Sequence, residues 1–538
     1  MDKILNLASG DYAVLLVLGA STVALLMRRS KGPLPPGPMA LPLLGNLLQM
    51  PRSEEWNTYA EWAKKYESSH ETTAGDITYL TLFGNPMIIL NSLKVVRELM
   101  NERSANYSNR PYSVMNELCG LTWILTNADG EAHRVRRSIV QRYFSGLAAV
   151  KHRSHQQDEA RVLANNLLKS PELIELHLKG HAASSILLGA YGFRVEGAKD
   201  RLVQQMDETS EHASRFPGFA SFLLEKVPAM RNYPRWMPFS GFRAYGDLVT
   251  RIFQAIRADP YERTMKLTAA GKATPSFVST SLDDLAAETS LSDKEREERV
   301  ELIKDCACVM YGAGTESSTA TMGTFCMMLA LHPEILKRAQ EELDKATGGE
   351  RLPTFDDERD LPYIDALFWE TLRYNTVTPL GLPHRVVNDD YYEGTLIPAG
   401  TTIVGNMWYA SLSFTDLILK LVRLIFRDPT VFTNPDQFTP ERFLGEKGKQ
   451  CRDVLTLVWG MGRRACPGRQ LAEASLFITM ATIASCFDIT PKSTNSFPQL
   501  EFSSGFVRRP KLFPVNINPR SSKWKEILER EFFPAVYS

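Results

Sequence analysis

The segment WGMGRRACPG, residues 459–468, decides more about the fold and chemistry of this protein than any other stretch. Its three glycines predict a tight loop that lets another group approach Cys466 closely. Arg463 and Arg464 precede the cysteine, and Pro467 leads into a helical run, so nearby positive charge and a helix N-terminus both favour a thiolate. A lone cysteine is more often a buried, unreactive side chain. This setting instead predicts a metal ligand.

The other six cysteines do not supply the rest of a metal site. They are spread along the chain, and no pair has zinc-ligand spacing with a matching second pair. No histidine lies near Cys466 in the sequence to complete a protein cage. A haem, whose porphyrin supplies four ligands of its own, is therefore the natural partner of Cys466. The low cysteine density indicates a reducing compartment.

Length and charge restrict the number of domains and the kind of partner that the protein can have. The 538 residues could form several domains, but the order of the motifs favours one catalytic domain over residues 39–538. The formal net charge is zero, so bulk electrostatics give no reason to expect a nucleic-acid partner.

The N-terminus predicts a membrane anchor over residues 1–31. Residues 4–27 are mostly apolar, with Asp11 the only charge, and basic residues follow directly. This order places the rest of the chain in the cytosol. A cleaved signal peptide is the alternative, but its positive charges should precede the apolar core. Residues 32–38, GPLPPGP, form a stiff hinge.

Periodicity predicts the main elements of the rest of the chain. Long helices are expected at 301–331 and 360–374, a β-hairpin at 75–91, and strands near 385–387 and 401–404. Gly312 and Gly314 each weaken the first helix by about 1 kcal/mol relative to Ala. Close approach of a flat ligand or a local kink would explain them. Residues 216–242 form either a core loop or an apolar rim that touches the membrane.

Four motifs together resemble the cytochrome P450 family over nearly the whole chain, most closely its fungal microsomal members. WGMGRRACPG is similar to the family's haem-binding loop, with Trp459 where Phe is usual. Glu370-Thr-Leu-Arg373 and Pro440-Glu-Arg442-Phe resemble two further segments. The resemblance implies a structural network of Glu370, Arg373 and Arg442. It also implies a mainly α fold with a smaller β-rich part, and a haem between the long central helix and the cysteine loop.

Residues 313–317, AGTES, resemble the family's oxygen-activating stretch. The resemblance implies that Glu316 is the acid and Ser317 the alcohol that deliver protons above the iron. Ser317 replaces the usual Thr and lacks the β-branch that stiffens its rotamer, so looser coupling of electrons to product is expected.

Other positions resemble the residues that hold the haem propionates. His133 and Arg137 lie in the segment DGEAHRVRR, where the family usually has Trp and Arg. His384 follows Pro383 in a second such segment, and Arg464, in the cysteine loop, is the fourth basic contact. Arg or protonated His pairs with carboxylates through charge-assisted hydrogen bonds.

The resemblance implies a monooxygenase of the endoplasmic reticulum membrane that contains haem b. One oxygen atom of dioxygen would enter an apolar substrate, with a terpenoid or aromatic compound of secondary or xenobiotic metabolism favoured. Electrons would come from an NADPH-dependent flavoprotein reductase, since the chain has no GxGxxG motif after a strand. Membrane lipid would be a further partner.

Two alternatives are open. A haem-thiolate isomerase or dehydratase acting on peroxides would need no reductase, and Glu316 and Ser317 speak against it. A non-catalytic haem carrier or sensor would not need this acid–alcohol pair either. NADPH-dependent product formation distinguishes the monooxygenase from both.

Residues 411–426, SLSFTDLILKLVRLIF, form an atypical insertion between segments that resemble the family. Its apolar residues share helical spacing and its basic residues add positive charge, which is typical of a helix lying on a membrane surface. A translated intron in the gene model is the preferred explanation, because the flanks match the family and the insertion does not. Sequencing the messenger RNA distinguishes the two.

Overall fold

The structure is a computed structural model that describes residues 32–66, 76–197, 199–214, 224–225, 227–237, 240–408, 425–492 and 500–537. The proposed anchor and residues 411–424 of the insertion lie outside these ranges. Within the described part of the chain, no helix is both long and apolar enough to cross a membrane. The chain divides into two compact units, residues 1–111 with 380–425, and residues 112–379 with 426–538.

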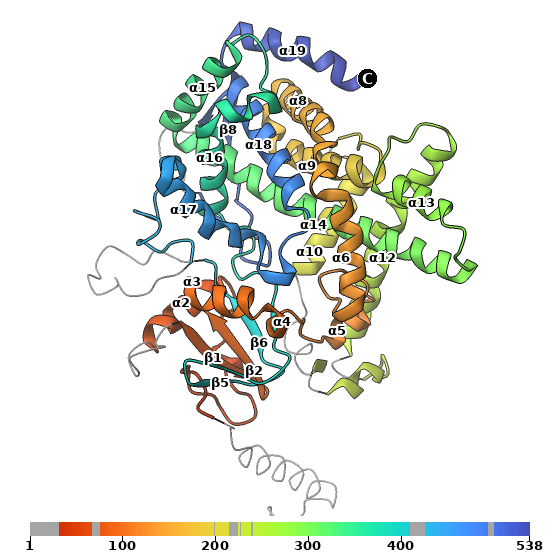
Figure 1. Cartoon of the computed structure of the whole chain (residues 1–538), viewed down its shortest axis with the longest axis vertical. Helices are drawn as coiled ribbons and strands as arrows, with labels where there is room; N and C mark the ends of the chain where they lie inside the picture. Colours follow the sequence, from red (N-terminus) through yellow and green to blue (C-terminus); the bar gives the residue numbers. More distant parts are fainter. Residues whose placement is uncertain are drawn as a thin grey trace, which may run out of the picture. The chain divides into compact units, whose positions relative to one another are not determined.

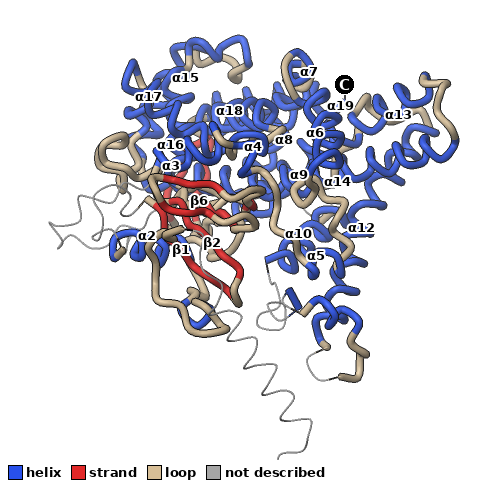
Figure 2. The backbone as a smooth tube through the Cα atoms, turned by 60° about the horizontal axis from the view of Figure 1, so that its bottom comes forward, coloured by secondary structure: helices blue, strands red, loops and turns tan. Residues whose placement is uncertain are grey.

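The first unit is built on a four-stranded sheet, whose strands are coloured red in Figure 2. The strand order is β1-β2-β6-β3, with β2 and β6 parallel and the other two pairs antiparallel. A second, two-stranded sheet pairs β4 with β5. The strands are β1 (Ile77–Leu82), β2 (Asn85–Leu90), β3 (His384–Arg385), β4 (Asp390–Tyr392), β5 (Thr395–Ile397) and β6 (Thr402–Gly405). The helices of this unit are η1 (Leu47–Gln49), α2 (Glu55–Lys65), α3 (Leu93–Val96), the π-helical η3 (Arg97–Glu102) and α4 (Ser104–Tyr107).

The first hairpin forms where the sequence predicts it. Phe83 and Gly84 make its two-residue turn and both have positive φ angles, 49° and 75°. Such angles match the twist of the flanking strands, and glycine adopts them without steric cost. On β2, Ile88, Ile89 and Leu90 are fully buried. The apolar run after the turn therefore becomes the interior of the sheet.

The second unit is almost entirely helical, and Figure 1 shows α14 running through it. Helix α14 contacts α6, α9, α12, α13, α16 and α18. The helices are α5 (Val114–Leu118), α6 (Gly130–Phe144), α7 (Leu147–Val150), α8 (Arg153–Lys169), η4 (Pro171–Leu173), α9 (Ile174–Tyr191), α10 (Arg201–Ser214), η5 (Pro228–Asn232), α12 (Gly241–Ala269), α13 (Phe277–Ala287), α14 (Asp293–Leu331), α15 (Pro333–Thr347), η6 (Phe355–Asp360), α16 (Pro362–Tyr374), η8 (Pro440–Phe443), α17 (Gly445–Leu455), η9 (Thr456–Trp459), η10 (Gly462–Arg464), α18 (Arg469–Cys486) and α19 (Ser522–Tyr537). One hairpin pairs β7 (Phe487–Pro491) with β8 (Val515–Pro519).

Helix α14 begins eight residues before the predicted start. Ser292 caps it, and Glu295 accepts a hydrogen bond from the backbone amide of Ser292, which completes a capping box. The helix ends at Leu331 because Pro333 starts the next helix. The prediction of a mainly helical fold with a smaller β-rich part is confirmed.

Candidate active site

The loop before Cys466 is closed by its own backbone. The amide of Cys466 donates a 2.6 Å hydrogen bond to the carbonyl oxygen of Trp459. Gly460 makes this possible with a φ angle of 87°, in the left-handed region that favours glycine. A Cβ atom at Gly460 would also lie 3.4 Å from the Cα of Ala465. The loop therefore presents Cys466 directly before α18 begins.

Cys466 differs from the other cysteines in its exposure. Its side chain is exposed, whereas the other six cysteines are buried. The protein atoms gathered around the loop limit hydration of the sulfur and so raise the pKa of the Cys466 thiol, while the backbone amide of Gly468 and the charge of Arg137 act in the opposite direction. An amide directed at the sulfur stabilises a thiolate, and a bound metal lowers a thiol's pKa much further.

The donor set fits a haem better than a metal held by protein alone. Among the described residues, no group of three or more His, Cys, Asp or Glu side chains could hold a metal ion. An accessible thiol without companion ligands suits a cofactor that brings four nitrogen ligands of its own. Cys466 would supply the axial ligand.

Arg137 and Arg464 join α6 to the cysteine loop. Arg137 donates a 2.7 Å hydrogen bond to the carbonyl oxygen of Ala465. Arg464 pairs at 2.5 Å with Asp129, which lies directly before α6. Burial lowers the pKa of both guanidinium groups. His133 is buried one turn before Arg137, on the same face of α6. Three of the four residues predicted to bind propionates thus lie around the cysteine loop.

His384 lies in the other unit, on β3. Its Nδ1 lies 2.6 Å from the carbonyl oxygen of Tyr107, so Nδ1 must be the donor. Arg110 donates hydrogen bonds to the carbonyl oxygens of Leu382 and Pro383 and so supports the segment before the histidine. Contact between His384 and a propionate stays a prediction.

Glu370, Arg373 and Arg442 form one buried cluster. Two hydrogen bonds of 2.7 and 2.8 Å join Glu370 to Arg373, and both side chains are fully buried. Arg442 lies 3.1 Å from the same carboxylate. Arg373 also donates to the carbonyl oxygens of Pro435 and Gln437. The cluster fixes the segment between the insertion and η8 against α16.

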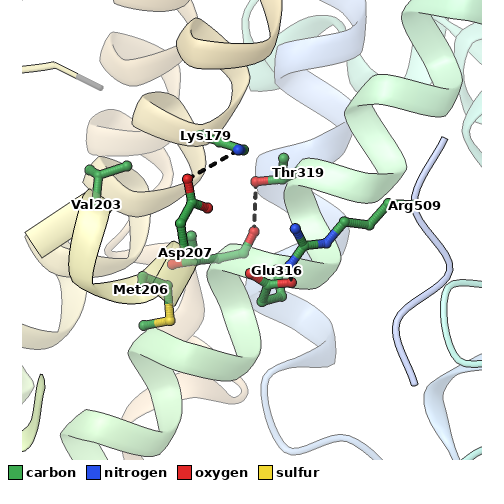
Figure 3. A pocket seen from close by; sticks show the side chains of 8 residues that line it. Lys179, Val203, Met206, Asp207, Glu316, Thr319 and Arg509 are labelled. Atoms are coloured by element: carbon green, nitrogen blue, oxygen red, sulfur yellow. Dashed lines mark hydrogen bonds and ion pairs between the residues drawn. The ribbon is translucent and has the colours of Figure 1, made fainter. Parts of the chain in front are cut away.

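The acid and the alcohol of α14 lie on different faces of the helix. Ala313 and Ser317 are exposed on one face, where the Ser317 hydroxyl donates to the carbonyl oxygen of Ala313. Glu316 is turned into a pocket and pairs with Arg509 (Figure 3). It also accepts a hydrogen bond from Ser210. Neither partner of Glu316 is indicated by the sequence, because both are far from it along the chain.

The two glycines of α14 differ in how closely the neighbouring helices pack on them. The helix is continuous through both. A Cβ atom at Gly314 would lie 2.7 Å from the Cδ1 atom of Ile186 on α9, whereas at Gly312 the nearest atom would be 3.8 Å away on Met206. Close packing of α14 against α9 therefore requires Gly314, and no such requirement applies at Gly312.

A glycine-rich cysteine loop in a large helical fold is the arrangement of a haem-thiolate enzyme, and comparison with known proteins agrees. The chain matches the family model for cytochrome P450 over residues 35–517. It is 34% identical to cytochrome P450 monooxygenase 208 of Postia placenta over 97% of each chain. Cytochrome P450 monooxygenase claR of Ampulloclitocybe clavipes is also 34% identical, over 95% of this chain and 91% of its own. Cytochrome P450 monooxygenase ple1 of Rhodocybe pseudopiperita is 32% identical over 93% and 92%.

The chain therefore belongs to the cytochrome P450 family and is a haem monooxygenase. The resemblance to fungal members is confirmed, since these three relatives come from fungi.

Proposed function

We propose that this chain inserts one oxygen atom into an apolar small molecule, with Cys466 as the axial ligand of haem b. The exposure of Cys466 carries this proposal, because the other six cysteines are buried. When bound, a haem with a thiolate ligand activates dioxygen for insertion of one atom, and the other atom leaves as water after two electrons and two protons are taken up. The protein positions the groups and supplies the protons.

The basic residues around the loop, His133, Arg137 and Arg464, would hold the propionates through charge-assisted hydrogen bonds. His384, on β3, is the fourth proposed contact. The ion pair between Arg464 and Asp129 restrains the Arg464 side chain. Because Arg137 also bonds to Ala465, a shift of α6 would disturb the cysteine loop and the propionate contacts together.

Glu316 and Ser317 supply the protons. The exposed Ser317 hydroxyl can exchange its bond to Ala313 for one to water, and Glu316 can replace the proton that this water gives up. Glu370, Arg373 and Arg442 take no part in the reaction and maintain the fold of this unit.

The proposed function also includes an electron donor, a place in the cell and a class of substrate. A separate NADPH-dependent flavoprotein reductase supplies the electrons, because the sequence has no dinucleotide-binding motif. Residues 1–31 anchor the chain in the endoplasmic reticulum membrane by a single span, residues 32–38 are the hinge, and residues 39–538 form the cytosolic catalytic domain. Apolar terpenoid or aromatic compounds of secondary or xenobiotic metabolism would enter from the lipid phase.

Replacement of the proposed ligand tests the central assignment. Cys466→Ala should abolish the reduced, carbon monoxide-bound absorption band of thiolate-ligated haem, because no other side chain of the loop can donate a thiolate. Cys119→Ala, which removes a buried cysteine elsewhere in the unit, should keep the band. An unchanged band in Cys466→Ala would refute the assignment.

A peroxide isomerase or dehydratase is the second candidate. One observation favours it: Glu316 is engaged by Arg509 and Ser210 and does not face Ser317. Such an enzyme would convert an organic hydroperoxide without NADPH. Membranes that contain the chain and a reductase should therefore be incubated with a panel of apolar compounds, with and without NADPH, and analysed by mass spectrometry. Product that requires NADPH supports the monooxygenase.

A further inference from the structure

A buried carboxylate connects three helices of the helical unit. Asp305 of α14 is 4% exposed. Its Oδ2 accepts a hydrogen bond from Arg136 of α6 at 3.2 Å, and its Oδ1 accepts one from Nε of Arg257 of α12 at 2.7 Å. Both of these helices contact α14 (Figure 1). Each carboxylate oxygen therefore holds the cation of a different helix through a charge-assisted hydrogen bond.

Helix α14 holds the backbone of Arg136 as well as its side chain. Cys306, the residue after Asp305, donates its thiol hydrogen to the carbonyl oxygen of Arg136, with 3.8 Å between sulfur and oxygen. Burial raises the pKa of this thiol to about 12, so the thiol keeps its proton and remains a donor at neutral pH. Two successive residues of α14 thus fix one residue of α6.

The α12 side of the network has a second carboxylate. Arg257 also pairs with Glu301 at 2.6 Å, and its guanidinium group lies 5.5 Å from the centre of the Trp123 ring. Burial opposes the charge of Arg257, but the bonds to Glu301 and Asp305 outweigh it and raise the pKa of the guanidinium group. Arg257 therefore keeps its charge and one carboxylate partner when Asp305 is removed.

Arg136 is followed in the chain by the residue that reaches the cysteine loop. Arg137 is turned by about 100° around the axis of α6 from Arg136. It donates the 2.7 Å hydrogen bond to the carbonyl oxygen of Ala465 that joins α6 to the loop. One turn of α6 thus contacts α14 on one side and the cysteine loop on another, so a displacement of Arg136 also displaces Arg137.

We propose that Asp305 is a positioning residue for the cysteine loop, because it holds α6 where Arg137 can bond to the loop. The inference rests on the proposed function, in which Cys466 of this loop is the axial ligand. Without the carboxylate, the charges of Arg136 and Arg257 would have no anion between them and would be poorly hydrated inside the protein. Their repulsion would move α6 away from α14, and Arg137 would lose its contact with the loop.

The release of haem from the holoenzyme measures how firmly the loop is held. Wild type, Asp305→Asn and Asp305→Glu are mixed with excess apomyoglobin, and the transfer of haem is followed by its absorbance. Asp305→Asn should transfer haem at least about tenfold faster than the wild type, the change expected when one charge-assisted hydrogen bond is lost. Asp305→Glu keeps the charge and should restore most of the wild-type rate.

Glu301→Gln is the matched control, because it removes the other carboxylate partner of Arg257. The bond between Asp305 and Arg136 stays in place, so haem should be transferred at the wild-type rate. Arg136→Gln removes only the α6 end of the network and should accelerate transfer as Asp305→Asn does. It carries the test on its own if Asp305→Asn does not fold.

The Arg137→Gln background separates positioning of the loop from a general loss of stability. If Asp305 acts through Arg137, Asp305→Asn should accelerate haem transfer much less in that background than in the wild type. An equal acceleration in both backgrounds would overturn the inference. So would an unchanged rate in Asp305→Asn or Arg136→Gln, or an acceleration of the same size in Glu301→Gln.

A different result would refute the proposed function. If the reduced wild-type protein lacks the carbon monoxide band of thiolate-ligated haem, or if Cys466→Ala keeps it, Cys466 is not the ligand. The transfer rates would still show whether Asp305 holds α6 against the loop, because the variants compared all keep Cys466.

Discussion

At the scale of single residues, Glu370 and Arg373 offer a comparison that the chain itself provides. They are spaced three apart on a helix and fully buried, whereas Glu446 and Lys449 have the same spacing at the surface. Spacing alone predicts similar weak pairs. Burial makes removal of one partner much more costly in the Glu370–Arg373 pair than in the exposed pair, because a charge left alone inside the protein cannot be hydrated.

Glu370→Gln should therefore lower the stability of the helical unit by about 3–5 kcal/mol, because Arg373 and Arg442 keep their charges and lose the shared carboxylate. Unfolding of a large cofactor protein is seldom reversible, so the measurement is the temperature at which half of the haem absorbance is lost at a fixed heating rate. Lys449→Gln should leave that temperature unchanged. Equal effects of the two substitutions would contradict the structural role of the buried cluster.

The sequence names candidate site residues but not the partners that they have in the fold. Arg464 was expected to favour the thiolate and bind a propionate, yet its partner in the structure is Asp129. The cation that acts most on Cys466 is Arg137, more than 300 residues earlier in the chain. Arg509, which engages Glu316, carries no motif. Such partners depend on tertiary packing, which one sequence without its fold does not reveal.

At the scale of elements, the periodic parts were predicted well and the polar start of α14 was not. Residues 293–300 are mostly charged and show no apolar period, so the helix was expected from Glu301. The signal was the capping box of Ser292 and Glu295. At Gly314 the sequence shows that a glycine inside a helix is unusual, but it does not show why. The residue that requires the glycine is Ile186, which lies on another helix, α9.

The two glycines of α14 should respond differently to alanine. Gly312→Ala should be neutral or stabilising by up to about 1 kcal/mol, because alanine favours the helix and the nearest atom is 3.8 Å away. Gly314→Ala should destabilise, because its Cβ would overlap Ile186. The double variant Gly314→Ala with Ile186→Ala should recover part of the lost thermal stability. Loss of stability in Gly312→Ala, or none in Gly314→Ala, would show that packing against α9 does not explain the pattern.

At the scale of the whole molecule, attachment to the membrane should depend mainly on residues 1–31. A chain that starts at Gly32 should bind haem but be removed from membranes more easily by high salt, because the apolar segment at 4–27 is gone. Some attachment should remain through exposed apolar side chains such as Trp236, which is 81% exposed. The measurement is the fraction that sediments with membranes before and after a salt wash. Equal retention of the shortened and full chains would show that the anchor lies elsewhere.

The parallel pairing of β2 with β6 has a consequence for biosynthesis. Ile88 pairs with Ile403, so the strand that completes the sheet leaves the ribosome roughly 300 residues after its neighbour, on the order of tens of seconds later at ordinary translation rates. Throughout that time the nascent β1–β2 hairpin exposes an apolar edge that nothing downstream can yet cover. The first unit of the chain to be synthesised is thus among the last to finish folding. Its exposed strand edge needs a chaperone that stays bound until β6 has been synthesised.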